Sequence, residues 1–528
     1  MDTTTRRIGL SLGADLCWPI CYEAIVRQLD LKLPIGREQV SFEVERVTIE
    51  PYDLRQPCRY DVVLDRLTHW YGMSREWIKK AVIMDGLYVF NNPWAIQSME
   101  KHTSYCAMMR LGMPVPDTWM VPAKAYDWKP DLEVTLQRYA RLFDLGEVGE
   151  KVGYPMYMKP YDGGGWQGVS RLDDETRLRE SYEASGTHLM HLQRAVDPWD
   201  RFVRCIALGP QTRVVRYDPA QPLHDRYTMD RGFVSDDERS LLEDMTLTIN
   251  AFFNWDFNSC EAMHRDGVWH PIDFANACPD SQVTSLHFHF PWMVMANLRW
   301  SLFCAATKRP MKLNQDWAPF YAVADSDLPY REKLRQWAAI AHQRFDTANF
   351  TAFCATYLPH LEQVTRDFFA TEVARDAVRQ KVAALYPEHE VEAFTQLFWD
   401  RIQQWRESPI EAPVSVTVPA AAKPMTLSET PPPAPAQPTP APSEIPPAPS
   451  EVPPPVPVEV PPAAPRATLH TKPAAVRAAA PRKPARPTAT TSEADAAVAA
   501  SVSKAAARAA KTLARAAEPR SARGGKLV

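Results

Sequence analysis

The stretch "YPMYMKPYDGGGWQGV" (Tyr154–Val169) joins a strand-like run to three consecutive glycines, and Lys159 stands near the end of the run. A tight turn needs one or two glycines, so three predict a flap whose backbone comes close to another group. Backbone N–H groups can surround phosphate oxygens, and a lysine at the end of a strand can reach the same oxygens. Taken alone, the pattern is a weak signal, because three glycines after a strand more often form a mobile hairpin tip.

The neighbouring segments favour the phosphate interpretation. Upstream, residues 93–112 predict one helix with Lys101 near its middle, followed by the turn "GMPVP". Downstream, "DFNSCEAMHRDGVWHPIDFANACPD" (256–280) predicts two strands joined by an Asp-Gly turn. Each strand carries a carboxylate, Glu261 and Asp273, and Asn276 follows. Carboxylate and amide oxygens suit Mg²⁺, which binds carboxylates together with nucleotide phosphates.

In this order, "GMPVPDTW", "YPMYMKPYDGGGWQGV" and "PIDFANACPD" resemble the ATP-grasp superfamily over residues 91–286. The first 90 residues resemble the Rossmann-like domain that often precedes it. The resemblance implies two α+β subdomains that hold ATP between them. It also implies activation of a carboxylate as an acyl-phosphate, followed by coupling to an amine or thiol.

The resemblance further implies roles for single residues. Two lysines would hold the phosphates, a glycine loop would close over them, and a hinge segment would contact adenine beside an acidic residue for the ribose. ATP contacts would come from Lys101, Lys159, Gly163, Gly164, Gly165, Gly168, Gln193, Arg194, Ala195, Val196 and Asp200. Arg204, with Arg216 as a second candidate, would stabilise the transferred phosphoryl group. Glu261, Asp273 and Asn276 would bind Mg²⁺.

The sequence departs from the family pattern at two points. The hinge begins with Gln193 where a glutamate is usual, and an amide oxygen can still accept a hydrogen bond. The usual Glu-x-Asn ending is one residue longer here, from Asp273 to Asn276. On a regular strand these two side chains would lie on opposite faces, so a bulge or the end of the strand must reorient one of them, or Asn276 is not a ligand.

Composition and patterning predict five segments. Alternating strand-like and helix-like pieces predict an α/β Rossmann-like domain with a mostly parallel sheet over 1–92. We then expect an α+β ATP-grasp domain over 93–305 and a helical appendage over 306–408. A proline-rich disordered linker over 409–465 and a basic disordered tail over 466–528 complete the chain.

Three further expectations follow from composition. The nine cysteines show no C-x-x-C pair and several lie in apolar runs, which predicts reduced core thiols. No long apolar run is present, so we expect a cytoplasmic protein without a signal peptide or transmembrane helix. In "SLHFHFPWM" (285–293), His287 and His289 would share one face of a strand, but without a third ligand we expect packing or substrate contact rather than a metal.

The leading hypothesis is therefore an ATP- and Mg²⁺-dependent ligase that joins a small-molecule carboxylate to an amine or thiol. An ATP-dependent phosphotransferase without ligation would use the same residues. A third possibility is a non-catalytic ATP-grasp scaffold whose function resides in a nucleic-acid-binding tail.

Charge separates the tail from the rest of the chain. Residues 466–528 hold 13 Lys and Arg against 3 Asp and Glu, a net charge of +10. Because the whole chain has a net charge of −4, residues 1–465 have a net charge of −14. A basic segment of this kind resembles tails that bind nucleic acid through phosphates without reading its sequence. A solubilising extension with no partner fits the composition as well, and an anionic membrane surface is the weaker alternative because the tail has little apolar bulk.

We predict that a chain ending at Glu411 loses DNA or RNA binding and keeps its ATP chemistry. The binding of the full chain should weaken steeply between low and physiological salt, because released counterions drive it. Filter-binding titrations of both chains test this. Equal binding by both chains, or binding that ignores salt, would exclude the tail as a nucleic-acid arm.

Overall fold

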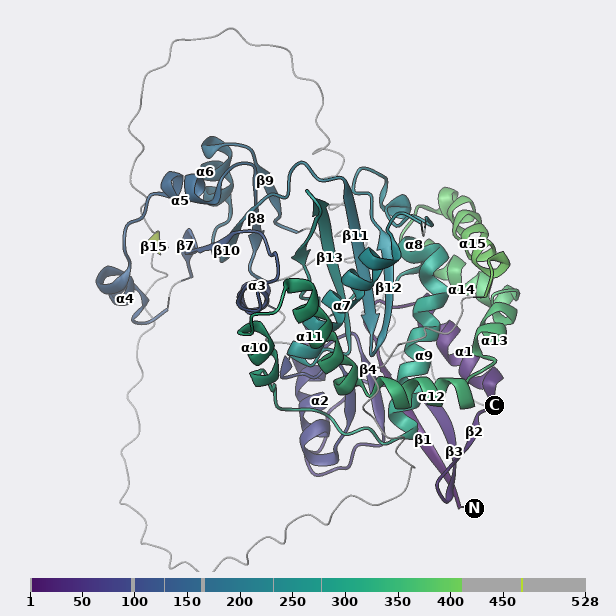
Figure 1. Ribbon diagram of the computed structural model, residues 1–528. Coiled ribbons are helices and arrows are strands. Elements are labelled where there is room, and N and C mark those ends of the chain that lie inside the picture. Colours follow the sequence, from purple (N-terminus) through teal and green to yellow (C-terminus); the bar gives the residue numbers. More distant parts are fainter. Residues whose placement is uncertain are drawn as a thin grey trace, which may run out of the picture.

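The computed structural model describes residues 2–95, 100–127, 129–162, 167–230, 232–276 and 278–410, and the backbone of 467–468. The expected glycine flap (163–165), residues 411–465 of the proline-rich linker and nearly all of the basic tail lie outside these residues. The described part is a mixed α/β structure built on three main sheets (Figure 1).

The first sheet is mostly parallel, as the alternating sequence pattern predicted. Its strand order is β2-β3-β1-β4-β5, and only the edge strand β2 runs antiparallel to its neighbour. The elements of this unit are β1 (Asp2–Ser11), α1 (Cys17–Leu29), β2 (Lys32–Ile35), β3 (Glu38–Arg46), β4 (Val62–Asp65), α2 (Gly72–Asp85) and β5 (Tyr88–Phe90). Because β1 and β4 are parallel neighbours, their carboxyl ends and the loops that follow lie at one edge of the sheet.

Helices cover both faces of this sheet. Val63 and Val89 pack with Ile78 and Val82 of α2 on one face. Leu64 of β4 lies on the other face, in the core that includes Tyr22 of α1. The strands are therefore buried from both sides, as the near-continuous apolar run of β4 requires.

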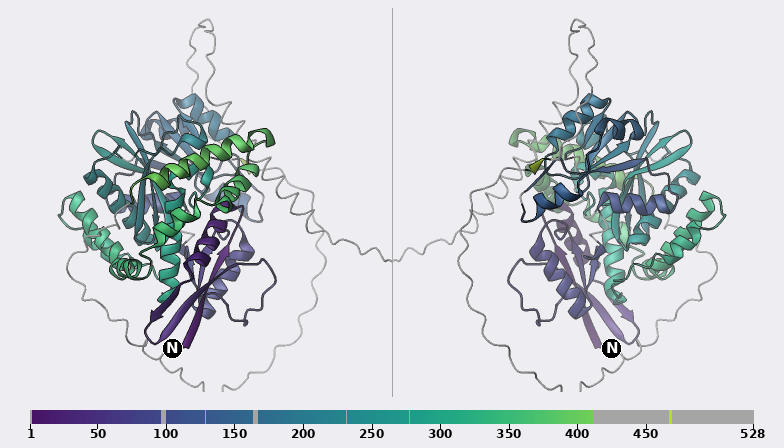
Figure 2. Two further views of the ribbon diagram at one scale, coloured as in Figure 1. Left: turned by 90° about the vertical axis from the view of Figure 1, so that its right-hand side faces the viewer. Right: turned by 90° about the vertical axis from the view of Figure 1, so that its left-hand side faces the viewer.

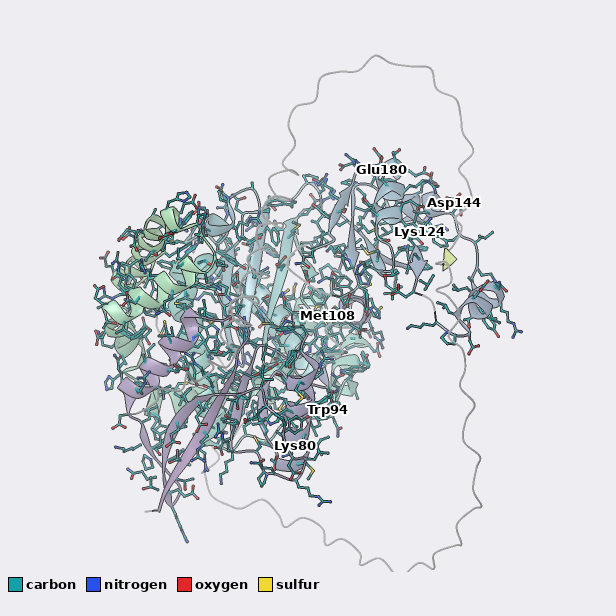
Figure 3. All side chains as sticks on the ribbon, turned by 180° about the vertical axis from the view of Figure 1, so that it is seen from behind. Lys80, Trp94, Met108, Lys124, Asp144 and Glu180 are labelled. Atoms are coloured by element: carbon teal, nitrogen blue, oxygen red, sulfur yellow. The ribbon has the colours of Figure 1, made fainter. Side chains whose placement is uncertain are left out.

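The second sheet belongs to a smaller lobe with its own core. The strand order is β6-β10-β8-β9, all antiparallel, and the side chains of α5 and α6 cover it. This lobe comprises β6 (Thr118–Val121), β7 (Ala125–Tyr126), α4 (Leu132–Tyr139), α5 (Leu145–Val152), β8 (Met156–Pro160), β9 (Ser170–Leu172), α6 (Glu175–Ala184) and β10 (Met190–Arg194); the two-residue β15 (Ala467–Thr468) pairs with β7. In Figure 3, the labelled Lys124, Asp144 and Glu180 lie together on this lobe, away from Lys80 and Trp94.

The third sheet is antiparallel, in the order β12-β11-β13-β14. It consists of β11 (Arg201–Leu208), β12 (Gln211–Arg216), β13 (Phe257–Arg265) and β14 (Val268–Asp273), with the 3₁₀ turn η2 (Leu223–Asp225) and the long helix α7 (Asp236–Phe253) inserted between β12 and β13. A capping box of Ser235 and Glu238 starts α7. The Asp266-Gly267 turn joins β13 to β14, as the sequence predicted.

The remaining residues are helical, as expected for 306–408, but these helices share one core with the first and third sheets. They are α8 (Val283–Leu286), η3 (His287–His289), α9 (Phe290–Ala306), α10 (Ala318–Ala324), α11 (Tyr330–Phe345), α12 (Thr347–Tyr357), α13 (Leu361–Phe368), α14 (Glu372–Ala383), η4 (Glu388–Glu390) and α15 (Val391–Glu407). Figure 2 shows the green C-terminal helices beside the purple first unit. The strand expected around His287 and His289 is wrong, because these residues form a 3₁₀ turn that leads into the fully buried α9.

A buried polar network fixes β13 against the first sheet. The side-chain amide of Asn91, just after β5, donates to the carbonyl of Phe257 (2.7 Å) and accepts from the backbone N–H groups of Asp256 and Phe257 (2.8 Å each). The hydroxyl of Tyr88 donates to Asp256 (2.7 Å), and Arg344 of α11 lies 3.4 Å from the same carboxylate. The start of the strand that carries Glu261 is thus held by the first sheet and by the helical region together.

Two expectations about composition can be compared with the described residues. Within these ranges, no helix combines the length and the apolar character needed to cross a membrane. All nine cysteines are free; five are buried, whereas Cys106 is exposed and so is not a core residue as predicted.

The β11–β12 turn generates a testable prediction about packing. Gly209 has φ +56°, and a Cβ there would lie 2.5 Å from Cδ2 of the buried Trp300 in α9. We expect Gly209→Ala to lower the free energy of unfolding by about 2–4 kcal/mol, through overpacking and a strained backbone. Thermal and urea unfolding measure the change.

The control is Gly267→Ala in the neighbouring β13–β14 turn. Gly267 also has positive φ (+79°), but nothing lies within 4 Å of its added Cβ. It should lose only about 1 kcal/mol, the cost of the backbone conformation. Equal losses in the two variants would contradict the packing argument.

Candidate functional site

Two carboxylates meet on adjacent strands of the third sheet. Glu261 of β13 and Asp273, the last residue of β14, are cross-strand partners, and the register shifts immediately after Glu261. Asn276 follows Asp273 and its amide donates to Ser259 Oγ (3.2 Å), two residues before Glu261 on β13. The irregular register and the end of β14 therefore bring Asn276 beside the strand that carries Glu261, despite the extra residue in the sequence.

Lys101 closes the site from α3 (Lys101–Arg110). Its ammonium lies 3.1 and 3.2 Å from the two oxygens of Asp273, and the residue is 5% exposed. The single helix expected over 93–112 is wrong, because Glu100 has an extended backbone and α3 begins at Lys101. The backbone N–H of Lys101, one of the unsatisfied donors of a helix start, donates to the carbonyl of Tyr161 just after β8 (2.9 Å).

Lys159 of β8 enters from the smaller lobe. It is buried, and its ammonium donates to the side-chain oxygen of Gln193 (2.7 Å) and to the carbonyl of Ile272 (3.3 Å). Burial lowers the pKa of Lys159 to about 8; Asp273 acts against this shift and Lys101 adds to it. A buried ammonium held by two neutral oxygens would be stabilised by an anion.

Arg204 of β11 completes the cluster. Its guanidinium donates to Glu261 and to the hydroxyl of Tyr227, and it lies 5.4 Å from the centre of the Tyr227 ring and 5.7 Å from that of Tyr217. Cys205 and Cys260 have the opposite orientation in their strands and share the hydroxyl of Thr246 in α7. Arg204 and Glu261 thus lie on the sheet face that α7 leaves uncovered.

Other residues suggested by the sequence lie outside this cluster. Arg194 is exposed and 3.6 Å from Asp117, Val196 packs in the core, and Asp200 lies 2.7 Å from His264 Nδ1 with its side chain 60% exposed. Arg216 pairs with Val203 in the sheet, so it points to the face opposite Arg204. The structure therefore brings Arg204, and not Arg216, to Glu261.

The chain is described on both sides of the glycine flap, up to Asp162 and again from Gln167. Gly168 has φ +69°, and a Cβ there would lie 2.9 Å from Cγ of Pro160. A glycine is thus required for the chain to fold back on the end of β8. The positions of Gly163, Gly164 and Gly165 fall outside the described residues.

Sequence patterns missed several neighbours of the lysines. His191 lies opposite Lys159 in the sheet and is 1% exposed, and among the described residues neither of its ring nitrogens has a hydrogen-bond partner. Burial, helped by His102 and the two lysines, lowers the pKa of His191 to about 3, so it stays neutral. Thr118 accepts a hydrogen bond from the Gln193 amide (2.9 Å) and so orients its oxygen toward Lys159. Strand alternation alone would have put His191 on the face that also carries Gln193, because the two residues are two positions apart on β10.

The residues present fit a nucleotide phosphate and a magnesium ion. Three cations, Lys101, Lys159 and Arg204, face only two carboxylates, so the buried cluster has room for negative charge. Glu261, Asp273 and the Asn276 amide supply oxygen donors of the type that Mg²⁺ binds. Among the described residues no group of three or more His, Cys, Asp or Glu side chains could hold a metal ion. A metal ion at this site would therefore have two protein carboxylates as ligands, and its other ligands would have to be of another kind.

No family model matches the sequence, and no curated protein matches it either. The structure is similar to D-alanine–D-alanine ligase from Bacillus anthracis complexed with ATP, with 13% identity, a TM-score of 0.37, and coverage of 65% of this chain and 99% of that chain. It is also similar to a RimK domain ATP-grasp protein from Sphaerobacter thermophilus, with 12% identity, a TM-score of 0.38, and coverage of 55% and 98%.

Proposed function

We propose that this chain is an ATP-dependent ligase of the ATP-grasp type, which activates a carboxylate as an acyl-phosphate and couples it to an amine or thiol. The observation that carries the proposal is the buried cluster in which Lys101, Lys159 and Arg204, from three different parts of the chain, meet the strand partners Glu261 and Asp273. The solved structures have TM-scores below 0.5, so these side chains alone support the proposal.

In this proposal Lys101 and Lys159 hold the ATP phosphates. Lys101 would leave Asp273 for a phosphate, and Asp273 would then be free, with Glu261 and Asn276, to bind Mg²⁺. The metal ion would neutralise phosphate charge when bound. Gln193 to Val196 would contact adenine, Asp200 the ribose, and Gly163–Gly165 with Gly168 would cover the phosphates.

The chemistry requires charge neutralisation more than acid–base groups. A substrate carboxylate oxygen attacks the γ-phosphorus, the bond to the β-phosphate oxygen breaks, and ADP leaves. The amine or thiol then attacks the acyl carbon and phosphate leaves. Arg204, fixed by Glu261 and Tyr227, would stabilise the charge that spreads over the transferred phosphoryl group.

The segment boundaries also remain a proposal: a Rossmann-like domain over 1–92, the ATP-grasp domain over 93–305, and helices over 306–408. The helical region shares the main core, so we infer that it folds with the rest.

Two alternatives use the same fold. A phosphotransferase would release ADP and a stable phosphorylated product, whereas a ligase would release ADP and phosphate in equal amounts. A scaffold would give neither product and would not bind ATP. Measuring ADP and phosphate in the presence of candidate amino acids distinguishes the three.

We predict that Lys159→Gln weakens ATP binding by about 10- to 100-fold, because a charged hydrogen bond to phosphate is lost. Its thermal stability should be unchanged or higher, since a buried charge disappears. Titration calorimetry and thermal unfolding measure both effects. The control is Lys151→Gln on the exposed side of α5, which should leave ATP binding unchanged.

The outcome against the assignment is ATP binding by Lys159→Gln with the affinity of the unmodified chain. A fall in stability together with lost binding would point to a structural role for Lys159 and would also count against the proposal.

A second prediction concerns pH. The lowered pKa of Lys159, about 8, means that the free protein loses this proton as the pH rises through about 8. Phosphate binding favours the charged form, so ATP affinity, measured in EDTA, should be level near pH 7 and fall by up to about tenfold per unit above pH 8.

The pH series needs Lys159→Gln as its control, so that the decline can be assigned to this residue. This variant should lose the decline above pH 8. A decline of the same slope in both proteins would assign the titration to another group.

A further inference from the structure

A second buried lysine lies away from the phosphate cluster. Lys381 of α14 is only 5% exposed, and within the described residues the structure gives its ammonium no hydrogen bond or ion pair. Helix α14 packs against α1 and α8, so this side chain is buried between the first unit and the loop region after β14. The ammonium itself is not among the fully buried atoms without a partner, so a ligand can reach it. A lysine this deeply buried is rare unless an anion is supplied to its ammonium.

The groups around Lys381 are charged, but their own hydrogen bonds are already made. Asp15 accepts from the indole N–H of Trp18 (2.8 Å) and from Arg66 Nε (3.3 Å). Asp280 accepts from Ser285 Oγ (2.5 Å) and from the backbone N–H of Gln282 (2.9 Å).

Four groups lie close enough to Lys381 to act on its pKa. Burial lowers its pKa, Asp15, Asp280 and Cys17 oppose the shift, and Arg66 adds to it. The two carboxylates are close enough to act on Lys381 but make no ion pair with it. The ammonium of Lys381 is thus the cation in this group that lacks an anion of its own.

The position of this group in the fold also points to a ligand. Asp15 follows β1 and Arg66 follows β4, so both lie at the carboxyl ends of neighbouring parallel strands, where open α/β sheets bind their ligands. Against the opposing effect of burial, the carboxylate of Asp280 raises the pKa of both Arg66 and Arg204 and therefore lies near both guanidinium groups. The group at Lys381 therefore adjoins the arginine proposed to stabilise the transferred phosphoryl group.

We propose that Lys381, with Arg66, binds a carboxylate of the small-molecule substrate, a carboxylate that does not itself react. This inference rests on the proposed function and narrows it: the substrate belongs to the class of amino acids or dicarboxylic acids rather than simple amines, thiols or monoacids. The negative charges of Asp15 and Asp280 lie in the same region and would favour an ammonium group on the ligand. An amino acid carries such a group beside its carboxylate, whereas a dicarboxylate does not.

The test measures thermal unfolding of the full chain without nucleotide. The probes are glycine, L-alanine, L-glutamate and succinate, each compared with its amide: glycinamide, L-alaninamide, L-glutamine α-amide and succinamide. At saturating concentration at least one carboxylate should raise the Tm by several degrees, and its amide should not. A response to amino acids alone, or to succinate alone, decides between the two sources of the carboxylate.

Lys381→Met should weaken the affinity for that carboxylate by about 10- to 100-fold. Without any ligand it should melt at the same temperature as the unmodified chain or higher, because an unpaired buried charge has been replaced by an apolar side chain of similar length. Lys381→Arg should keep part of the response. Arg379→Met, on the exposed side of the same helix and paired with Glu392, is the matched control and should change neither property.

Three results overturn the inference: no carboxylate raises the Tm, the amides act equally well, or Lys381→Met keeps the full response. A lower Tm for Lys381→Met without ligand would also overturn it, by showing that the lysine is structural. ATP titration of the same variants separates this inference from the proposed function. If the unmodified chain fails to bind ATP, the proposed function fails, whereas the carboxylate response is measured without ATP.

Discussion

The ion pair between Lys101 and Asp273 ties together the parts of the molecule that form the site. Lys101 is the first residue of α3 and Asp273 the last of β14, so the pair joins the start of a helix to the end of a strand. The backbone of Lys101 is held by Tyr161 after β8, and the carbonyl of Ile272, beside Asp273, receives Lys159. The smaller lobe and the third sheet thus meet at two consecutive residues of β14.

This arrangement leaves an imbalance of charge that explains what the site can bind. Each carboxylate is already paired, Asp273 with Lys101 and Glu261 with Arg204. Lys159 donates only to neutral oxygens, and its burial, together with the charge of Lys101, lowers its pKa against the opposing effect of Asp273. In the proposed function, an entering phosphate would pair with the cations and leave the carboxylates free to bind a metal ion. Before any ligand binds, both carboxylates are paired with cations, so neither is an unpaired buried charge.

Sequence reasoning succeeded where a residue's role depends on local pattern. The β13–β14 hairpin with its Asp-Gly turn, the parallel first sheet and the pairing of Glu261 with Asp273 all follow from strand alternation and turn residues. It failed where tertiary packing decides. The helix expected over 93–112 begins only at Lys101. The alternating apolar pattern around His287 belongs to a 3₁₀ turn before α9. Nearly every side chain of α9 is buried, so its sequence shows no helical periodicity of apolar residues.

The same limit explains why one lysine was recognised and the other was not. Lys159 stands in a strand before a glycine run, so its environment can be inferred from its neighbours. Lys381 stands in an ordinary amphipathic helix, 222 positions further on, and only the packing of α14 against α1 and α8 brings it to Asp15 and Asp280. Both lysines lie in the core with less negative charge than they require. Because burying such groups does not stabilise a fold, we propose anionic ligands for both, a phosphate at Lys159 and a carboxylate at Lys381, and the electrostatic effect of Asp280 on Arg204 links the two groups.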